Sequence, residues 1–173
     1  MITDDEFEQL YRATAPELFA YLRRRGATDA EDLVAEVYAI AWRRRADLPS
    51  ALLRRAWLFG TARKLLLSDS RARGREHEIV TEATLHDAPA PQAADSGTRD
   101  AVSAALGRLG AEDRELILLV EWEQMVPAEV AVVLGMRPGT VRVRLHRARQ
   151  RLAADPSLKA LVGRRHPIGL AVD

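Results

Sequence analysis

The stretch EVAVVLGMRPGTVRVRLHRARQRL, residues 129–152, predicts two helices joined by a tight turn. Gly135 suits the turn because glycine adopts the positive φ that commonly ends a helix. Along the second helix, apolar residues recur at helical spacing and predict one buried stripe: Val141, Leu145, Ala148 and Leu152. This arrangement is typical of a DNA-binding helix-turn-helix, whose second helix enters the major groove.

The charge of the second helix favours the same interpretation. Residues 137–151 contain six arginines and no acidic residue. A solvated helix on an ordinary bundle usually mixes charge signs, because opposite charges four residues apart attract each other. Arginine also binds guanine and phosphate through paired hydrogen bonds. We therefore expect this helix to contact nucleic acid.

The composition narrows the class of protein. The chain has 173 residues, with 26 Lys and Arg against 25 Asp and Glu, so any nucleic-acid surface must concentrate its positive charge locally. Because cysteine is absent, neither disulfides nor cysteine-ligated zinc can hold the fold. The acidic start MITDDEFEQL is unlike a signal peptide, and no apolar run approaches the roughly 20 residues of a membrane span. We expect a cytoplasmic protein with no membrane contact of its own.

Linker composition divides the chain. Residues 75–97 carry Pro89, Pro91 and Gly97 among small polar residues, which is typical of a flexible tether. We therefore expect an all-α protein with two small helical domains, divided into a first domain over 1–74, a linker over 75–97, a second domain over 98–154 and a tail over 155–173. A tether of this length permits compact and extended placements of the domains. Its acidic residues favour simple solubility, with mimicry of nucleic acid as the alternative.

The first domain shows helical periodicity with recognisable helix ends. Thr3 and Glu6 form a capping-box pattern at the start of the first helix, which Pro16 restarts or kinks. Thr28 and Glu31 repeat the capping-box pattern before a second helix. A third helix follows. No segment shows sustained alternation of apolar and polar residues, so we expect no sheet.

The order of the motifs resembles that of a known family. DAEDLV at residues 29–34, AWL at residues 56–58 and GTVRVRLHRAR at residues 139–149 occur in family order and with family spacing. The chain resembles an extracytoplasmic-function (ECF) sigma factor of bacterial RNA polymerase over about residues 6–152. The resemblance implies a protein that is not an enzyme, needs no cofactor, directs core polymerase to promoters and helps to melt the −10 element.

The resemblance also implies partners for particular residues. As sigma region 2, the first domain would bind the β′ clamp helices of core polymerase through Asp32, Leu33 and Glu36. It would bind the −10 element of promoter DNA through Arg54, Arg55, Trp57, Arg63 and Lys64. As sigma region 4, the second domain would bind the β flap, and it would bind the −35 element through Arg137, Pro138, Gly139, Thr140, Arg142, Arg144, Arg147 and Arg149. An anti-sigma factor that holds both domains is a further expected partner.

Physical chemistry gives these candidates different roles. Asp32 and Glu36 share one helical face beside Leu33, and a mixed acidic and apolar face suits a basic coiled coil. Trp57 occupies a core-like position, so the neighbouring arginines are better candidates than this ring for binding the freed DNA strand. On the recognition helix we expect base contacts from Arg137, Thr140, Arg142 and Arg144, and phosphate contacts from Arg147 and Arg149.

Two positions depart from the family pattern in ways that affect recognition. Lys64 stands where the family often has asparagine, so the preferred −10 sequence is expected to differ. Arg137 stands where a capping serine is common, so the pattern does not fix the first residue of the recognition helix.

Two other classes of function compete with this interpretation. A stand-alone helix-turn-helix regulator would need a dimerisation surface and a palindromic site, and the chain shows no coiled-coil heptads. An enzyme is the weaker alternative, because the sequence shows no metal-ligand cluster, nucleophile arrangement or phosphate-binding glycine loop. The histidines are isolated from one another: His77, His86, His146 and His166.

Overall fold

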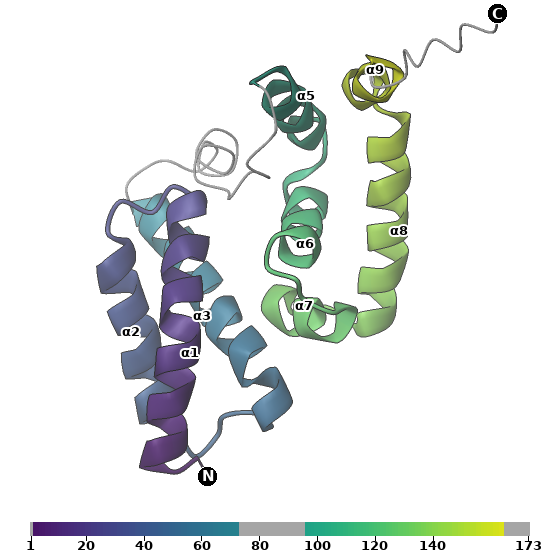
Figure 1. The fold of residues 1–173 in the computed structure, drawn as a ribbon. Helices are drawn as coiled ribbons and strands as arrows, with labels where there is room; N and C mark the ends of the chain where they lie inside the picture. Colours follow the sequence, from purple (N-terminus) through teal and green to yellow (C-terminus); the bar gives the residue numbers. More distant parts are fainter. Residues whose placement is uncertain (1, 73–95, 165–173) are drawn as a thin grey trace, which may run out of the picture.

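The computed structural model describes residues 2–72 and 96–164, and all regular elements in these ranges are helices (Figure 1). The N-terminal half, residues 2–72, contains α1 (Asp4–Arg24), α2 (Ala30–Arg43) and α3 (Ala51–Ala72). The C-terminal half, residues 96–164, contains α5 (Ser96–Gly107), α6 (Ala111–Glu121), α7 (Pro127–Leu134), α8 (Pro138–Ala154) and α9 (Pro156–Arg164). The all-α prediction is confirmed. The predicted linker lies outside the described residues except for its last two positions, which begin α5.

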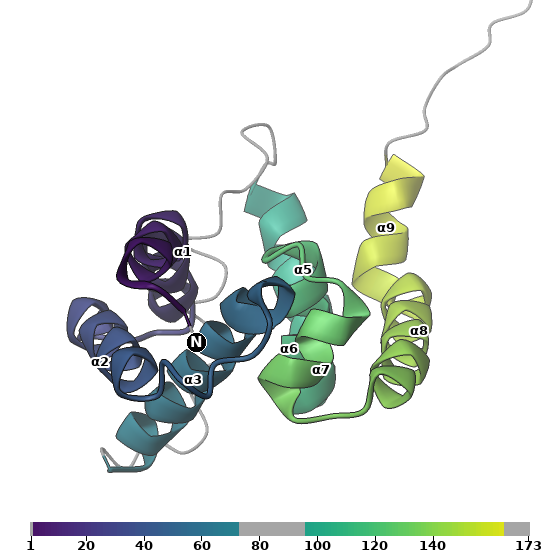
Figure 2. The same ribbon diagram turned by 90° about the horizontal axis from the view of Figure 1, so that it is seen from below.

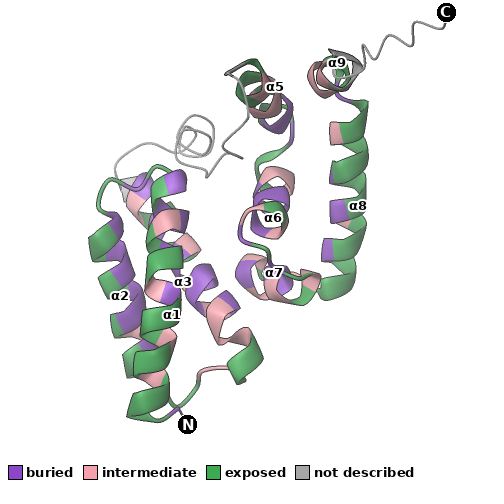
Figure 3. Ribbon diagram, in the orientation of Figure 1, coloured by how far each residue is buried: buried purple, intermediate pink, exposed green. Residues whose placement is uncertain are grey.

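The N-terminal half forms a three-helix core in which α1, α2 and α3 all pack against one another (Figure 3). Its most buried side chains come from every one of these helices: Leu18, Tyr21, Leu22, Val37, Leu58 and Phe59. Aromatic edge-to-face contacts continue the core toward the start of α1, where Phe7 meets Tyr38 and Trp42. This packing fixes which face of α2 and which face of α3 remain outside.

The helix ends of the N-terminal half differ partly from expectation. The first capping box is confirmed, because the Glu6 amide donates to Thr3 Oγ1 and the Thr3 amide donates to Glu6 Oε2. The second capping box is wrong: the N-cap of α2 is Asp29, which makes no side-chain capping hydrogen bond and has a φ of −111° and a ψ of 54°. A regular cap needs an extended backbone at that position.

Pro16 neither restarts nor interrupts α1, which runs as one helix through it. Proline removes the amide that would bond to the carbonyl four residues earlier, at Arg12. Both residues are exposed, so water can reach that carbonyl and the helix continues.

The C-terminal half adds a helix that the sequence did not predict. Residues 156–164, assigned to the tail, form α9, which packs against α5 and α8. Asp155 stabilises this junction: its carboxylate accepts from the Ser157 amide at 2.9 Å and from Arg108 Nε at 2.7 Å. The hydrogen bond from Arg108 holds the pKa of Asp155 at about 2. The C-terminal half therefore continues for one helix beyond residue 154, where the sequence analysis ended the second domain.

The two halves lie directly against each other, with α3 packed across α7 (Figure 2). Gly60 of α3 lies so close to α7 that a Cβ there would meet the Val133 Cα at 3.4 Å. The sequence allowed both compact and extended placements of the two domains, and in the structure the two halves pack against each other.

Candidate nucleic-acid interface

Helices α7 and α8 form the predicted helix-turn-helix. Gly135 follows α7 with a φ of 65°, the left-handed conformation that glycine adopts without strain. The Met136 amide then donates to the Ala131 carbonyl at 2.9 Å, which closes the end of the helix. Helix α8 begins at Pro138, and its N-cap Arg137 makes no side-chain capping hydrogen bond. Helix α8 therefore forms without the capping serine that is common at position 137, and Pro138 occupies its first turn.

The apolar stripe of α8 is buried as predicted. Val141 and Ala148 are 0% exposed and Leu145 is 6% exposed, while Leu152 is partly buried. Helix α8 packs against both α6 and α7 through this stripe. The opposite face of α8 must consequently point to solvent, because a helix buries only one stripe against two neighbours.

The solvent face of α8 carries most of the predicted DNA-contacting residues. Those that the structure leaves exposed are Arg137, Pro138, Gly139, Thr140, Arg142, Arg147 and Arg149. Among the described residues, neither Arg142 nor Arg147 has an ion-pair partner. A Cβ at Gly139 would meet nothing within 4 Å, so this glycine is not required by packing inside the chain. Guanidinium groups without ion-pair partners, beside an exposed helix N-terminus, suit the binding of a negatively charged ligand.

Arg144 differs from the other arginines of α8. Its Nε and Nη2 both donate to Asp113 Oδ1, at 2.8 and 2.6 Å, and it also pairs with Glu112. These hydrogen bonds from Glu112 and Asp113 raise the pKa of Arg144. The side chain is 28% exposed and joins α8 to the start of α6. Arg144 thus has a structural partner that the sequence analysis, which assigned it to bases, did not foresee.

Two further arginines of α8 form ion pairs with acidic residues near the two ends of α6. Arg149 donates to Glu121 at 2.7 Å, and Arg151 pairs with Asp113 at 3.0 Å. Both arginines are exposed, so these surface pairs contribute little stability and can exchange for phosphate contacts.

We expect Arg144→Ala to lower the free energy of unfolding by about 1–2 kcal/mol, because it removes hydrogen bonds between charged groups that are largely shielded from water. Arg142→Ala, the matched control two residues earlier, should change stability by no more than about 0.5 kcal/mol. Urea unfolding followed by circular dichroism measures both. Equal stability of the two variants would show that the Asp113 pair does not hold α8 on α6.

The predicted −10 residues divide between two faces of α3. Arg54, Trp57 and Lys64 share one face by helical spacing. Of these, Lys64 is exposed, Arg54 is half-buried and Trp57 packs partly against the core. Arg55 and Arg63 lie on another face of α3 by helical spacing, and Arg55 contacts both α1 and the C-terminal half. The sequence treated these five residues as one group, and the structure does not bring them together on one surface.

Arg55 is committed to contacts within the chain. Its Nε donates to Glu17 at 2.7 Å and its Nη2 donates to the Glu123 carbonyl at 2.9 Å. Its guanidinium also lies over the Phe59 ring, 4.8 Å from the centroid. In this arrangement Arg55 links the two halves.

The acidic face of α2 is exposed, but its predicted apolar member is not. Asp32 and Glu36 both face solvent. Leu33 is only 8% exposed and belongs to the core of the N-terminal half, so it lies beneath the acidic face. Helical spacing predicts which residues lie near the same face of a helix, but it does not show which of them are buried in the core.

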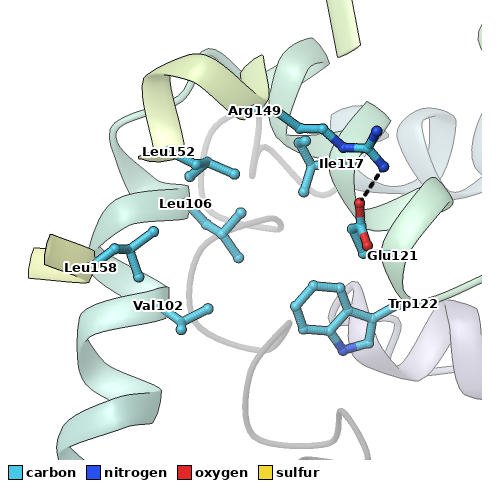
Figure 4. A pocket seen from close by; sticks show the side chains of 8 residues that line it. All are labelled: Val102, Leu106, Ile117, Glu121, Trp122, Arg149, Leu152 and Leu158. Atoms are coloured by element: carbon cyan, nitrogen blue, oxygen red, sulfur yellow. Dashed lines mark hydrogen bonds and ion pairs between the residues drawn. The ribbon is translucent and has the colours of Figure 1, made fainter. Parts of the chain in front are cut away.

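A pocket opens on the C-terminal half between α5, α6, α8 and α9 (Figure 4). Its volume is about 190 Å³, and it is lined by Val102, Leu106, Ile117, Glu121, Trp122, Arg149, Leu152 and Leu158. The Glu121–Arg149 ion pair lies beside an otherwise apolar wall. Sequence patterns missed this pocket because Leu158 comes from α9, which they did not predict.

Other kinds of site have no support in the part of the chain that the structure describes. No group of three or more histidine and acidic side chains there could hold a metal ion. No helix in the same residues is long and apolar enough to cross a membrane.

Comparisons with known proteins agree with this architecture. Residues 99–152 match the family model for sigma-70, region 4. The chain is 34% identical over 151 residues to the ECF RNA polymerase sigma factor SigL of Mycobacterium tuberculosis, covering 80% of this chain and 82% of SigL. It is 31% identical over 155 residues to the RNA polymerase sigma-E factor of Streptomyces coelicolor, covering 87% and 85% of the two chains.

Two solved structures share the fold. One is the sigma factor RpoE in complex with the anti-sigma factor NepR from Bartonella quintana, with a TM-score of 0.64 and 29% identity, covering 89% of this chain and 97% of RpoE. The other is CnrH in complex with the cytosolic domain of CnrY, with a TM-score of 0.58 and 25% identity, covering 88% of each chain.

Proposed function

The chain belongs to the extracytoplasmic-function sigma factors of RNA polymerase, and on this premise we propose how its two halves share promoter recognition. The C-terminal half binds the −35 element through α8, and the N-terminal half docks on core polymerase and binds the −10 element. The observation that carries this division is the exposed arginine face of α8 on a helix-turn-helix. The chain performs no chemical step of its own and acts in the cytoplasm, where the polymerase is.

Recognition of the −35 element follows from the order of side chains along α8. Arg137, Thr140 and Arg142 lie near the start of the helix, the part that meets base edges in a helix-turn-helix. Arg147 lies one to two turns later, where the groove wall presents phosphates. Gly139 has no side chain to obstruct the approach of the DNA backbone.

Separate readouts distinguish a base contact from a phosphate contact. Arg142→Ala should weaken binding to the cognate −35 duplex by about 10- to 100-fold and should reduce discrimination at one base pair. Arg147→Ala should weaken binding to all duplexes alike and should lower the slope of log affinity against log salt by about 0.9. Fluorescence anisotropy across a salt series measures both effects. Interchanged or identical behaviour of the two variants would contradict the assignment.

In the N-terminal half, separate surfaces serve polymerase and DNA. Asp32 and Glu36 present two carboxylates on α2 that complement a basic partner, the β′ clamp helices. Lys64 with Arg54 and Trp57 offers the freed −10 strand a cationic and aromatic face of α3. Leu33 acts only by holding the acidic face in place, because it is buried.

We also assign an anti-sigma factor to this chain as a regulatory partner. RpoE and CnrH, which share its fold over nearly their full lengths, were each solved with a protein partner, the anti-sigma factor NepR and the cytosolic domain of CnrY. A partner that covers both halves would block polymerase and promoter at once.

Run-off transcription with purified bacterial core polymerase tests the function. Core polymerase with this protein should initiate at defined sites in a genomic promoter library, and core polymerase alone should not. Changing the −35 or the −10 sequence of a selected promoter should abolish the product. If initiation is not stimulated and the protein alone binds a palindromic duplex tightly, it is a stand-alone regulator instead.

A further inference from the structure

The pocket of the C-terminal half brings apolar side chains from separate elements to one place. Leu106 and Ile117 are buried in it, and the other apolar side chains that line it are only half-buried: Val102, Trp122, Leu152 and Leu158. Figure 4 shows the aliphatic side chains facing Trp122 across the pocket. Its volume of about 190 Å³ exceeds the roughly 150 Å³ of an apolar cavity that binds benzene. The pocket therefore has room for a large aliphatic side chain.

The lining of the pocket selects an uncharged ligand. Covering half-buried apolar side chains is favourable in proportion to the area that is removed from water. The charged groups of the lining, Glu121 and Arg149, pair with each other at 2.7 Å. Because this pair leaves no unpaired charge in the lining, an aliphatic group suits the pocket better than a charged one.

The chain carries such a group just beyond α9. Residues 167–172 read PIGLAV, which we name the PIGLAV segment; it has no charged residue and contains the aliphatic side chains of Ile168, Leu170 and Val172. The segment lies outside the described residues. It follows α9, which supplies Leu158 to the wall of the pocket. A tether this short gives the segment an effective concentration of about a millimolar at the pocket.

The length of chain between α9 and the segment is sufficient for docking. Leu158 lies six residues before Arg164, the end of α9, which is about 9 Å along the helix axis. Four extended residues, 165–168, span up to about 13 Å, so Ile168 can return to the level of Leu158. Leu170 follows with enough further chain to cross the pocket toward Trp122.

The linker is a poorer candidate for the same pocket, although it leads to α5, another wall. Its apolar residues are separated by acidic ones: Glu78, Glu82 and Asp87. Burying such a stretch would remove carboxylates from water without a cationic partner, since Arg149 already pairs with Glu121. Charge therefore favours the PIGLAV segment as the occupant.

We propose that the pocket between α5, α6, α8 and α9 is an intramolecular docking site for the PIGLAV segment, with Ile168 and Leu170 inserted against Trp122. Docking covers the apolar wall and holds α9 on α5 and α8. Any protein partner of this face must first displace the segment, which makes the segment an internal competitor. The docking site is independent of the promoter-binding function proposed above.

Fluorine NMR on the full chain tests the docking. The chain has three tryptophans, so labelling with 5-fluorotryptophan gives three signals, and Trp122→Phe identifies the one from the pocket. Because the sequence contains no cysteine, Asp173→Cys carries a single nitroxide next to the segment. The nitroxide should broaden the Trp122 signal and should leave the signal of Trp42, on α2 of the other half, sharp.

Serine substitutions in the labelled chain test which side chains hold the segment. Ile168→Ser combined with Leu170→Ser should abolish the broadening, because it removes the aliphatic groups without changing any charge or any described residue. Ala171→Ser, the matched control, alters only a small side chain and should keep the broadening. Absence of broadening in the labelled parent chain, or equal broadening in the double serine variant, would overturn the proposal.

A mixture of two chains separates the segment of the same molecule from that of a neighbour. One chain carries the nitroxide without fluorine, and the other carries fluorine without the nitroxide. The mixture should show no broadening of the Trp122 signal. Broadening in the mixture as strong as in the doubly labelled chain would assign the pocket to a second copy and would overturn intramolecular docking.

Hydrogen exchange measures how firmly docking holds α9. A chain that ends after His166 keeps every described residue, so its circular dichroism should match that of the full chain. Its α9 amides should exchange about tenfold faster, the factor that corresponds to a segment docked about nine times in ten. The α2 amides, in the other half, should exchange at unchanged rates. Equal exchange of α9 in both chains would overturn the proposed role of the segment.

Discussion

With aspartate in place of Val141, the C-terminal half should lose about 3–5 kcal/mol of its free energy of unfolding. Val141 is 0% exposed and belongs to the stripe that holds α8 on α6 and α7. An aspartate there would be close to valine in size but would bury a carboxylate without a cationic partner, which is strongly destabilising. Because isolated domains have only about 5–15 kcal/mol of stability, most of the helix-turn-helix population should unfold at moderate urea concentrations.

Val143→Asp is the matched control, since it makes the same chemical change two residues further along α8. Val143 is 51% exposed, so its substitution should alter stability by no more than about 0.5 kcal/mol. Hydrogen exchange of the α6 and α8 amides measures the two variants in the full chain. Fast exchange should appear in the Val141 variant alone. Comparable protection in both variants would contradict the orientation of α8.

The helix-turn-helix was predictable because its determinants are local. A glycine at the end of one helix, a proline at the start of the next and a stripe at helical spacing are all visible within residues 129–152. The structure gives Gly135 the left-handed φ and buries Val141 as these patterns indicate. Local sequence patterns therefore predicted both the position of α8 in the chain and the face that it buries.

The assignment of individual arginines was less successful, because it depends on contacts distant in sequence. Arg144 lies in the same arginine-rich stretch as the exposed arginines of α8, yet it pairs with Asp113, which lies 31 residues earlier in the sequence. Neither charge nor spacing indicates which arginine meets an acid on another helix. The second capping box failed for a different, local reason, since the chain entering α2 does not adopt the extended backbone that a cap requires.

The contact between the halves was missed, although the sequence carried a signal. Charged residues are almost never fully buried unless they are paired. Glu115 directly precedes the apolar run Leu116–Leu119, and Arg24 and Arg25 stand at the C-terminal end of α1, just after buried Leu22. Charges at such positions indicate a buried ion pair, but the sequence does not say that the partner lies on the other side of the linker.

Reversing the acidic face of α2, with Asp32→Lys and Glu36→Lys together, should abolish stimulated transcription and weaken binding to core polymerase by about 100-fold or more. Each reversal replaces an attractive contact with a repulsive one, and each needs to contribute only about 1.4 kcal/mol to give that factor. Both side chains are exposed and lie above the buried Leu33, so the fold should tolerate the change.

A matched control separates this effect from net charge. Asp4→Lys with Asp5→Lys changes the charge by the same amount at exposed positions in the first turn of α1. It should cost about 0.3–1 kcal/mol for each lost interaction with the helix dipole and should retain transcription. Titration of each variant against labelled core polymerase, beside run-off transcription on one promoter, gives both readouts. If the α2 reversal binds polymerase as wild type does, the polymerase surface lies elsewhere on the chain. If it binds normally but fails in transcription, α2 acts after docking, at promoter opening.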